Sequence, residues 1–480
     1  MNYSAPCYVP IEITSKCNLN CKHCYGKFPR NIGCEITTQQ IKDIIYDLYK
    51  IGVFRIEIGG GEPTLRDDFF EILEYASTFQ DIDIAVVTNG ILMNEELITK
   101  IKKINHKRIW FHVSVDGYDC ETYGFLRNDK HAFTTLMHNI KNMLKAGLNV
   151  AWNVAIGKET VKYLLSIIDL GKEIGIKHIR LMLLYDTGRS KDNYLGFTFK
   201  EYQNFLKDYI NGKYEDSKIN IKLSLTQPFE CLIPLMELGY DKEFILSKID
   251  SLHETCMANN IYRSMTNKSC PAGRNMLAID SQGDVHFCCM LTSYEEMAGG
   301  NVFNTSIKEI WDDSNNFKWI RNIQLEDLNT NCYLCKYKDI CGGGCRARAM
   351  YNSGNFLDCD PLCPLVEYEY KPLTNYSKFV REVDVSDKLV VRQSQINDQD
   401  VFTLWIGELP LRVRKEDFGG SVFNSRGKIY TINQDGFTLL KFLHNDMSIK
   451  NFTEFLSNHN VSLDDNPIEK FENYVQMLLK

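Results

Sequence analysis

Three cysteines near the start of the chain have a spacing suited to metal chemistry. They read Cys17-Asn-Leu-Asn-Cys21-Lys-His-Cys24, and three thiolates at this spacing fit one face of a [4Fe–4S] cube. Such a cluster usually takes four cysteines, and the next one here is Cys34. The simplest interpretation is a cluster with one open iron that could bind a substrate or cofactor. The alternative is three reduced cysteines with a structural role.

The surrounding sequence predicts the elements that would position these thiols. From residue 9 to about 185, short apolar runs alternate with amphipathic stretches. We expect strands at Val9–Ile13, Arg55–Gly59, Ile82–Val87, Ile109–Val115, Leu148–Ile156 and His178–Leu184. We expect helices near Thr37–Lys50, Asp67–Phe79, Asn94–Lys103, Ala132–Lys145 and Glu159–Gly171. This alternation predicts parallel strands with helical crossovers, and six units predict an α/β fold with a partial (β/α)6 barrel.

Notable residues follow the carboxyl ends of these strands, where function gathers in such sheets. The cysteines follow the first strand, and Gly59-Gly60-Gly61-Glu62-Pro63 follows the second. Thr88-Asn89-Gly90 and Asp116-Gly117 follow the third and fourth. We therefore expect one site at this end of the barrel.

The cysteine triad and the glycine motif together resemble a radical S-adenosylmethionine enzyme over residues 7 to 190. The resemblance implies that Cys17, Cys21 and Cys24 hold [4Fe–4S], and that the methionine part of S-adenosylmethionine fills the open iron. An electron from the cluster then releases a 5′-deoxyadenosyl radical. One departure is His23, which stands where the family often has an aromatic residue.

The same resemblance suggests residues that bind S-adenosylmethionine. Glycine lets the backbone approach the bound amino group without a Cβ in the way. The ribose or the carboxylate would be bound by polar residues at strand ends and by arginines. The residues expected to bind the cofactor are Gly60, Gly61, Glu62, Ser114, Asp116, Asn153, Arg127 and Arg180. Each has an ordinary alternative as a cap, a turn residue or a solvated charge, and the sequence does not identify a catalytic residue.

A second group of cysteines resembles the SPASM extension, which carries two auxiliary [4Fe–4S] clusters. The pattern is Cys270-x12-Gly283-x4-Cys288, then Cys332-x2-Cys335-x5-Cys341-x3-Cys345, then Cys359 and Cys363. The family pattern gives the first auxiliary cluster Cys270, Cys288 and Cys345, with Cys256 as the favoured fourth ligand over Cys289. It gives the second cluster Cys332, Cys335, Cys341 and Cys363, with Cys359 as the less favoured competitor. Tetrahedral zinc is the alternative for this group.

The C-terminal segment resembles the peptide-recognition domain typified by the small chaperone of pyrroloquinoline quinone biosynthesis. We expect strands at Phe402–Ile406, Leu409–Arg414, Gly420–Phe423 and Lys428–Ile432, and helices near Gly436–Leu443, Ile449–Leu456 and Pro467–Leu478. The resemblance implies a winged-helix-like α+β fold that binds the leader of a precursor peptide as an added strand. A structural cap or a DNA-reading winged helix is the alternative.

The expected domains are the barrel at 1–195, a helical bridge at 196–255, the SPASM domain at 256–375, a linker at 376–400 and the peptide-recognition domain at 401–480. With 55 Lys and Arg against 62 Asp and Glu, the net charge of −7 argues against a general nucleic-acid or membrane-surface partner. We expect no signal peptide and no membrane span, and a cytoplasmic location.

These features favour a radical S-adenosylmethionine maturase with three [4Fe–4S] clusters, supplied with electrons by a flavodoxin or ferredoxin. Its substrate would be a ribosomally synthesised precursor peptide, and the product a thioether, a carbon–carbon crosslink or a dehydrogenated residue. The alternatives are a sulfatase-type maturase that oxidises Cys or Ser of a protein, and a non-catalytic iron–sulfur scaffold for electron transfer.

Overall fold

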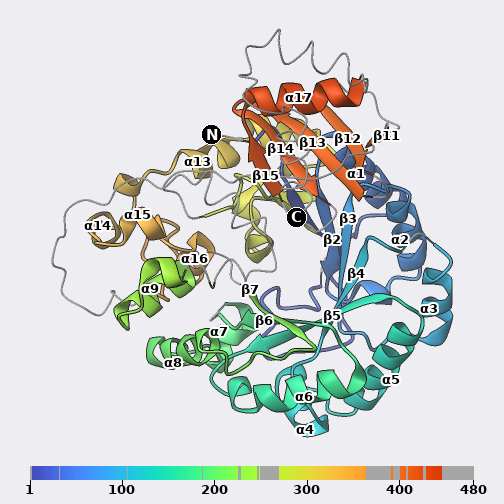
Figure 1. Cartoon of the computed structure of the whole chain (residues 1–480), viewed down its shortest axis with the longest axis vertical. Helices are drawn as coiled ribbons and strands as arrows, with labels where there is room; N and C mark the ends of the chain where they lie inside the picture. The colour runs from blue at the N-terminus through green and yellow to red at the C-terminus, as the bar shows by residue number, and fades with distance from the viewer. Residues whose placement is uncertain are drawn as a thin grey trace, which may run out of the picture.

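The structure is a computed structural model of the whole chain (Figure 1). It describes residues 3–31, 33–104, 106–185, 187–224, 229–245, 248, 270–363, 391–392, 400–406, 409–424 and 429–445. The fold class predicted from the sequence is confirmed. The chain forms a mixed α/β fold with a partial parallel barrel and a separate antiparallel sheet.

Seven neighbouring parallel strands build the barrel part of a ten-stranded sheet. They are β1 (Tyr8–Thr14), β2 (Arg55–Gly60), β3 (Asp83–Thr88), β4 (Ile109–Ser114), β5 (Asn149–Ile156), β6 (His178–Leu183) and β7 (Asn220–Ser224). All six predicted strands are present. The seventh, β7, was not predicted, because its sequence Asn-Ile-Lys-Leu-Ser is short and mostly polar.

The helices that follow these strands are α1 (Thr38–Lys50), α2 (Phe69–Ser77), α3 (Glu95–Ile101), α4 (Cys120–Arg127), α5 (Ala132–Lys145), α6 (Leu164–Ile174), α7 (Gly188–Asn193), α8 (Phe199–Ile210) and α9 (Phe229–Glu237). Of these, α1, α2, α3, α5 and α6 cover the outer side of the curved sheet, whereas α7 packs on the backbone of Cys24 and α9 lies beside the second cysteine region (Figure 1). The helix α1 begins at a capping box, in which Thr37 accepts from the Gln40 backbone and Gln40 accepts from Thr37. Its apolar stripe, which includes Ile41 and Leu48, is fully buried.

The two faces of the barrel sheet differ in polarity, because successive side chains of a strand point to opposite faces. Ile11, Ile58 and Phe111 lie in the same buried core as the helix residues Ile41 and Leu48, so these strand positions face outward. The alternate positions face the barrel interior, and they include Tyr8, Glu12, Glu57, His112, Ser114, Asn153 and Arg180. The interior is therefore polar and able to contact a polar ligand.

The second cysteine group continues the same sheet. Strand β8 (Ala278–Ile279) pairs in parallel with β1, and β9 (Asp284–His286) and β10 (Ala298–Asn301) follow in antiparallel order. The helices of this region are α12 (Ile307–Asp313), α13 (Asn315–Asn322), α14 (Thr330–Tyr333), α15 (Lys338–Cys341) and α16 (Arg346–Ser353). The pairing of Ile11 with Ile279 joins the region directly to the first barrel strand.

The C-terminal unit is a five-stranded antiparallel sheet with one described helix. It contains β11 (Val391–Arg392), β12 (Val401–Ile406), β13 (Leu409–Glu416), β14 (Gly419–Asn424), β15 (Ile429–Ile432) and α17 (Gln434–Asn445). The four predicted strands and the first predicted helix are present. The predicted helices near Ile449–Leu456 and Pro467–Leu478 lie outside the described residues.

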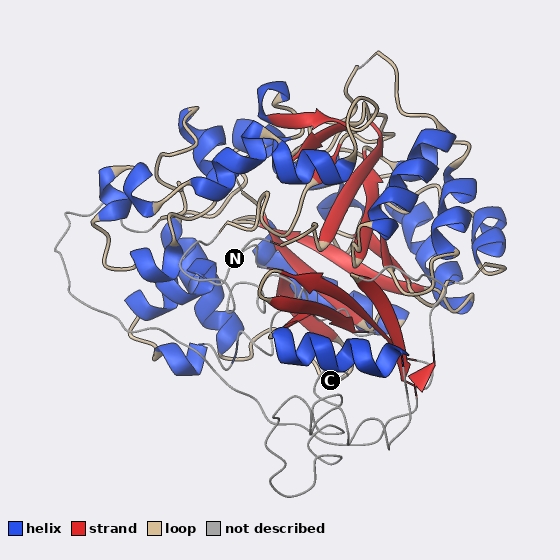
Figure 2. Cartoon of the chain, turned by 90° about the horizontal axis from the view of Figure 1, so that it is seen from above, coloured by secondary structure: helices blue, strands red, loops and turns tan. Residues whose placement is uncertain are grey.

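Both faces of this sheet are covered. On one face, α17 packs over the strands, with the rings of Phe402 and Phe437 5.8 Å apart (Figure 2). On the other, Phe423 stacks on Phe54 of the barrel at 5.3 Å. The sheet thus has two edges, formed by β11 and β15, that no strand of the described residues covers.

Buried charged side chains fasten the C-terminal sheet to the barrel. Arg412 donates to Asp81 at 2.6 Å and to the Tyr49 carbonyl at 2.6 Å. Arg414 pairs with Glu416 at 2.7 Å and donates to the carbonyl oxygens of Pro6 and Gly52. These arginines are almost fully buried, so their N–H groups can find hydrogen-bond acceptors only within the interface. Within the described residues, no helix is long and apolar enough to cross a membrane.

Candidate functional site

The first cysteine loop leaves the carboxyl end of β1 and is held by the glycine motif. The Gly61 amide donates to the Thr14 carbonyl and the Glu62 amide to the Lys16 carbonyl, both at 2.8 Å. A Cβ on Gly61 would lie 1.9 Å from the Lys16 oxygen, and Gly60 has a φ of +115°. Glycine is therefore required here for close packing against the backbone that leads into Cys17.

Glu62 is buried and uses both carboxylate oxygens to join β2 to the end of β3. One oxygen accepts from the Thr64 and Thr88 hydroxyls at 2.5 and 2.7 Å, and the other from the Asn89 amide at 2.7 Å. Burial raises the pKa of Glu62, while these hydrogen bonds oppose the rise. Glu62 thus holds the turn after β3, from which Asn89 donates to Asn18 of the cysteine loop at 2.7 Å.

Asp116 and Arg127 form a buried pair that reaches the cysteine loop. Arg127 Nε donates to Asp116 at 2.5 Å, and the other Asp116 oxygen accepts from the Ala155 amide at 2.7 Å. Arg127 Nη1 lies 3.7 Å from Cys21 Sγ. Burial raises the pKa of the Cys21 thiol, and the positive charge of Arg127 opposes that rise. The structure thus places both residues on the cluster loop, and the predicted contacts with cofactor ribose or carboxylate stay predictions.

Ser114, Asn153 and Arg180 form a row across neighbouring strands in the barrel interior. Ser114 pairs with Asn153 across β4 and β5, and Asn153 pairs with Arg180 across β5 and β6. The buried Asn153 Oδ1 makes no hydrogen bond of full geometry with the described residues, although the Asn153 side chain interacts with His112. Arg180 Nη1 lies 3.0 Å from His112 Nδ1. Burial and then Arg180 lower the pKa of His112 well below its usual value, so its ring is neutral. A ligand that donates a hydrogen bond could bind to Asn153 Oδ1 in this row of side chains.

Three residues near the first cysteine loop were missed from the sequence. Arg189 donates to the carbonyl oxygens of Cys21 and Phe28 at 2.7 and 2.6 Å, across more than 160 residues of chain. His23 lies 3.8 Å from Asp116, and burial and the charge of Arg127 lower its pKa to about 4. Tyr8 donates to Glu57 at 2.6 Å in the interior. Of these, only His23 carried a sequence signal, as a departure from the family motif.

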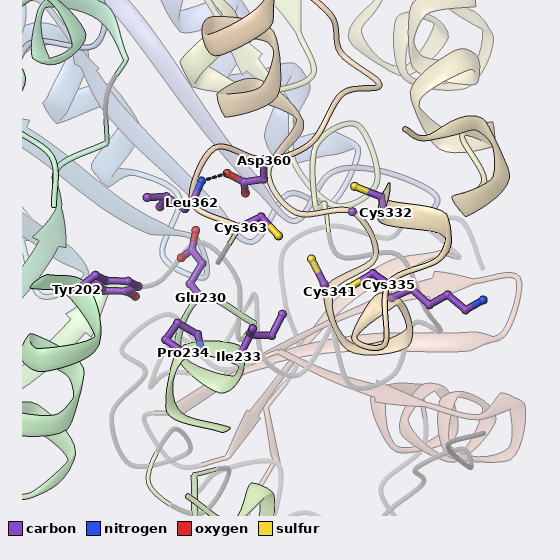
Figure 3. A pocket seen from close by; sticks show the side chains of 12 residues that line it. Tyr202, Glu230, Ile233, Pro234, Cys332, Cys335, Cys341, Asp360, Leu362 and Cys363 are labelled. Carbon is purple, nitrogen blue, oxygen red and sulfur yellow. Dashed lines mark hydrogen bonds between the residues drawn. The ribbon is translucent and has the colours of Figure 1, made fainter. Parts of the chain in front are cut away.

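The cysteines predicted for the second auxiliary cluster line one pocket. Cys332, Cys335, Cys341 and Cys363 surround a hollow whose wall also contains Glu230, Ile233 and Pro234 (Figure 3). Cys332 Sγ lies 3.4 Å from Cys359 Sγ, although Cys359 does not line the pocket. The structure therefore brings the four predicted ligands together and places the less favoured Cys359 against one of them.

The cysteines predicted for the first auxiliary cluster also act on one another. Cys289 and burial raise the pKa of Cys288 well above its usual value, and Cys345 and Cys270 raise it further. Burial raises the pKa of Cys345 to about 12. Cys256, the favoured fourth ligand, lies outside the described residues. The three described thiols are thus near enough for mutual electrostatic effects.

A buried arginine and two buried carboxylates hold together the segments that carry the two auxiliary cysteine sets. Arg348 pairs with Glu230 at 2.5 Å and with Asp360 at 2.6 Å. Asp360 accepts from the Cys345 amide at 2.7 Å, and both Asp360 and Glu230 line the pocket of the second group. The carboxylates compensate the buried guanidinium, whose pKa they raise above its usual value.

The donor chemistry of both regions fits iron–sulfur clusters. In the described residues, no three His, Cys, Asp or Glu side chains are arranged to hold a single metal ion. The thiols lie in loops, turns and short helices. Burial raises the pKa of Cys17 to about 11, so a bound cation would have to favour the thiolate that a cluster requires. Cys17, Cys21 and Cys24 would hold one cluster on this account.

Comparisons with known proteins agree with this donor set. Residues 11–171 match the model of the radical SAM superfamily, and residues 270–336 match an iron–sulfur cluster-binding domain, SPASM. The chain is 30% identical over 361 residues to the AdoMet-dependent heme synthase of Methanosarcina barkeri, covering 75% of this chain and 97% of that relative. It is 27% identical over 399 residues to the mycofactocin maturase MftC of Mycolicibacterium smegmatis, covering 81% and 92%.

Among solved structures, SuiB of Streptococcus suis bound to S-adenosylmethionine aligns with a TM-score of 0.59 at 19% identity, over 75% of this chain and 78% of that one. This likeness concerns the fold. The 30% identity over nearly the whole length of a relative, together with the two domain matches, establishes the family. The chain belongs to the radical SAM superfamily, with an iron–sulfur cluster-binding SPASM domain.

Proposed function

We propose that the protein is a maturase that modifies a ribosomally synthesised precursor peptide by radical chemistry. The observation that carries the proposal is the edge of the C-terminal sheet at β15, in a unit that is fastened to the barrel. The kinship with a mycofactocin maturase, at 27% identity over 81% of the chain, supports it. So does the likeness of the fold to SuiB bound to its precursor peptide SuiA.

The first cysteine loop would hold the cluster that binds S-adenosylmethionine, which when bound supplies a 5′-deoxyadenosyl radical. The buried Asn153 Oδ1 would accept a hydrogen bond from the bound cofactor at the row it forms with Ser114 and Arg180. The Gly61 and Glu62 amides hold the backbone that leads into Cys17, and the loop itself is held by the Leu126 carbonyl at Lys22 and by Arg189 at the Cys21 carbonyl. Such fixation would keep the reacting groups in register.

The polar barrel interior would receive the part of the peptide that reacts. Tyr8 and Glu57 form a hydrogen-bonded pair there, and burial together with the nearby charges of Glu57 and Cys289 raises the pKa of Tyr8 well above its usual value. The Tyr8 hydroxyl would therefore stay protonated and act as a donor. Tyr25 of the cysteine loop is near enough to both Cys289 and Cys24 for their charges, after burial, to raise its pKa.

The edge of the C-terminal sheet would bind the leader of the peptide. In the described residues β15 is an edge strand of the C-terminal sheet, and an extended peptide can join such an edge by β-augmentation. Because α17 and the barrel cover the two faces, an added strand at an edge is the mode of binding that the described part of the chain leaves open. Strand β15 ends close to α17 in sequence, and its Tyr430 and Thr431 are partly exposed. Binding there would raise the effective concentration of the reacting segment at the barrel.

We further propose three [4Fe–4S] clusters, with the two in the SPASM region held by the cysteines described above. A flavodoxin or ferredoxin would supply electrons, and the protein would act in the cytoplasm. The product would be a thioether, a carbon–carbon crosslink or a dehydrogenated residue.

A second candidate is chemistry on a tetrapyrrole. It is favoured by the heme synthase of Methanosarcina barkeri, which is 30% identical. However, that alignment covers 97% of the relative but only 75% of this chain, so about a quarter of the chain has no counterpart there. That quarter is long enough to hold the C-terminal sheet, which is the feature that favours a peptide.

The test measures leader binding and edge pairing together. The probe is a fluorescein-labelled synthetic peptide that corresponds to the N-terminal half of each short open reading frame found beside the gene, titrated into the full-length protein. Tyr430→Pro removes a main-chain donor of β15 and restricts its backbone, whereas Tyr430→Ala keeps that donor. We expect the proline variant to weaken leader binding at least tenfold, about 1.4 kcal/mol, and the alanine variant to weaken it less.

Cleavage of S-adenosylmethionine without peptide should be unchanged in both variants, which shows that the barrel is intact. Equal affinity of the proline variant and the wild type for the leader would show that the leader does not bind at β15. Titration of the wild type with iron coproporphyrin III, read by its Soret band, tests the second candidate. Tight porphyrin binding without leader binding would reject the peptide proposal.

A further inference from the structure

The pair formed by Asp116 and Arg127 lies against a cysteine that the radical site requires. Arg127 is the last residue of α4 and Asp116 follows β4, so both come from rigid elements. Their side chains are almost fully buried, with relative exposures of 9% for Arg127 and 0% for Asp116. The Leu126 carbonyl also accepts from the Lys22 amide at 2.8 Å, which joins the end of α4 to the cysteine loop.

The orientation of the pair brings positive charge toward sulfur. Asp116 is anchored by the Ala155 amide at 2.7 Å and holds Arg127 through Nε at 2.5 Å. That leaves Arg127 Nη1 directed at Cys21 Sγ, at 3.7 Å. The guanidinium therefore lies between the carboxylate and the thiol, and its positive charge acts on Cys21 more strongly than the negative charge of Asp116 does.

We infer that Arg127, positioned by Asp116, sets the reduction potential of the cluster held by Cys17, Cys21 and Cys24. Hydrogen bonds and positive charge at a ligand sulfur stabilise the reduced, more negative cluster and thus raise its reduction potential. Arg127 is a positioning residue in this account and need not touch S-adenosylmethionine. The inference rests on the radical site alone and is independent of the peptide substrate.

The chain offers a matched control in Arg189. This second arginine also contacts the cysteine loop, but it donates to the carbonyl oxygens of Cys21 and Phe28 instead of to a thiol. Arg127→Met and Arg189→Met therefore remove the same type of side chain from the same loop. Only the first removes a donor that faces a ligand sulfur.

The experiment is an anaerobic redox titration of the reconstituted enzyme without S-adenosylmethionine. It follows the EPR signal that is missing from the Cys17→Ala, Cys21→Ala, Cys24→Ala variant. At a fixed applied potential, Arg127→Met should lower the ratio of reduced to oxidised cluster at least tenfold, which is about 59 mV for one electron. Arg189→Met should lower this ratio less than Arg127→Met does, because it removes donors to carbonyl oxygens of the loop and no donor to a ligand sulfur.

Arg127→Met leaves Asp116 buried without its partner, so the double variant Asp116→Asn, Arg127→Met guards against misfolding. It removes both charges, and the side-chain carbonyl oxygen of the introduced asparagine can still accept from the Ala155 amide. We expect a smaller fall in the ratio than in Arg127→Met, but in the same direction. A ratio unchanged in the double variant, or lowered equally by Arg189→Met, would overturn the inference. If Arg127→Met leaves the ratio unchanged but weakens S-adenosylmethionine binding tenfold, the inference is also wrong. Arg127 would then bind the cofactor carboxylate, as expected from the sequence.

Discussion

The two cysteine regions are built by different means. The first is one loop at the end of β1. Main-chain hydrogen bonds from Gly61 and Glu62 hold the backbone that leads into it. The second draws its thiols from several short helices and turns between 270 and 363. There, the buried Arg348 binds carboxylates that belong to two different parts of the fold, Glu230 and Asp360.

This difference indicates which interactions keep each region folded. The first loop inherits order from the barrel sheet, so it should keep its fold without its cysteines. The second region has short strands and few regular elements of its own, and its order depends on buried charge and, on our proposal, on bound clusters. The free energy of metal binding to such a region contributes to its free energy of folding. The predictions below test this contrast.

The largest effect is expected at the first loop. Changing Cys17, Cys21 and Cys24 together to Ala should abolish formation of 5′-deoxyadenosine, because no iron would remain to bind S-adenosylmethionine. The far-ultraviolet circular dichroism should stay that of the wild type, since main-chain bonds hold this loop. Chromatography of anaerobic reaction mixtures measures the product. Residual 5′-deoxyadenosine would show that these thiols do not hold the radical-generating cluster.

In the second region, we expect Cys332→Ala with Cys335→Ala to stop peptide modification while cofactor cleavage continues. These residues line the pocket between α9 and α15, away from the first loop. Mass spectrometry of the peptide and assay of 5′-deoxyadenosine separate the two steps. Normal peptide modification would limit this site to a structural role, and loss of cleavage would refute the separation of the regions.

The dependence of the second region on buried charge is tested at Arg348. Arg348→Met leaves Glu230 and Asp360 buried without their cation, and should lower the free energy of unfolding by about 3–5 kcal/mol. Urea unfolding followed by intrinsic fluorescence measures it. Asp312→Asn is the matched control, because it breaks an exposed pair with Lys308 in the same region and should leave the unfolding midpoint unchanged. Equal effects of the two changes would contradict the contrast.

The smallest of these effects is expected at the C-terminal sheet, which is also fastened by buried charge. Asp81→Asn should weaken its docking by about 2–3 kcal/mol, because Arg412 loses its carboxylate but keeps the Tyr49 carbonyl. Hydrogen exchange in β12 and β13 should then increase while exchange in β1 to β6 stays slow. Equal protection in mutant and wild type would show that apolar contacts alone hold the sheet.

Much of this architecture follows from local sequence pattern. The strands β1 to β6, the helices with clear amphipathic period and the strands β12 to β15 were all predicted, because each has its own periodicity or turn residues. The spacing of Cys17, Cys21 and Cys24 is local in sequence, whereas the two auxiliary sets were expected from the resemblance to the SPASM pattern and stay predictions. By contrast, β7 lacks a strong pattern, since it is short and lies at the edge of the barrel sheet.

Contacts between distant segments could not be predicted. Arg412 meets Asp81 across 331 residues, and Arg189 reaches Cys21 across 168. Arg127 was expected at the cofactor carboxylate, and the structure shows it between Asp116 and Cys21. In each case the residue type was informative, but its partner was decided by tertiary packing that no single-sequence pattern records.

The most direct test of the account counts iron and sulfide in anaerobically reconstituted protein. With three four-iron clusters, the wild type should hold about twelve irons per chain, and the variant that lacks Cys17, Cys21 and Cys24 about eight. The variant that lacks Cys332 and Cys335 should also fall toward about eight. A wild-type value near four would contradict the account, because the cysteines between 270 and 363 would then hold no cluster.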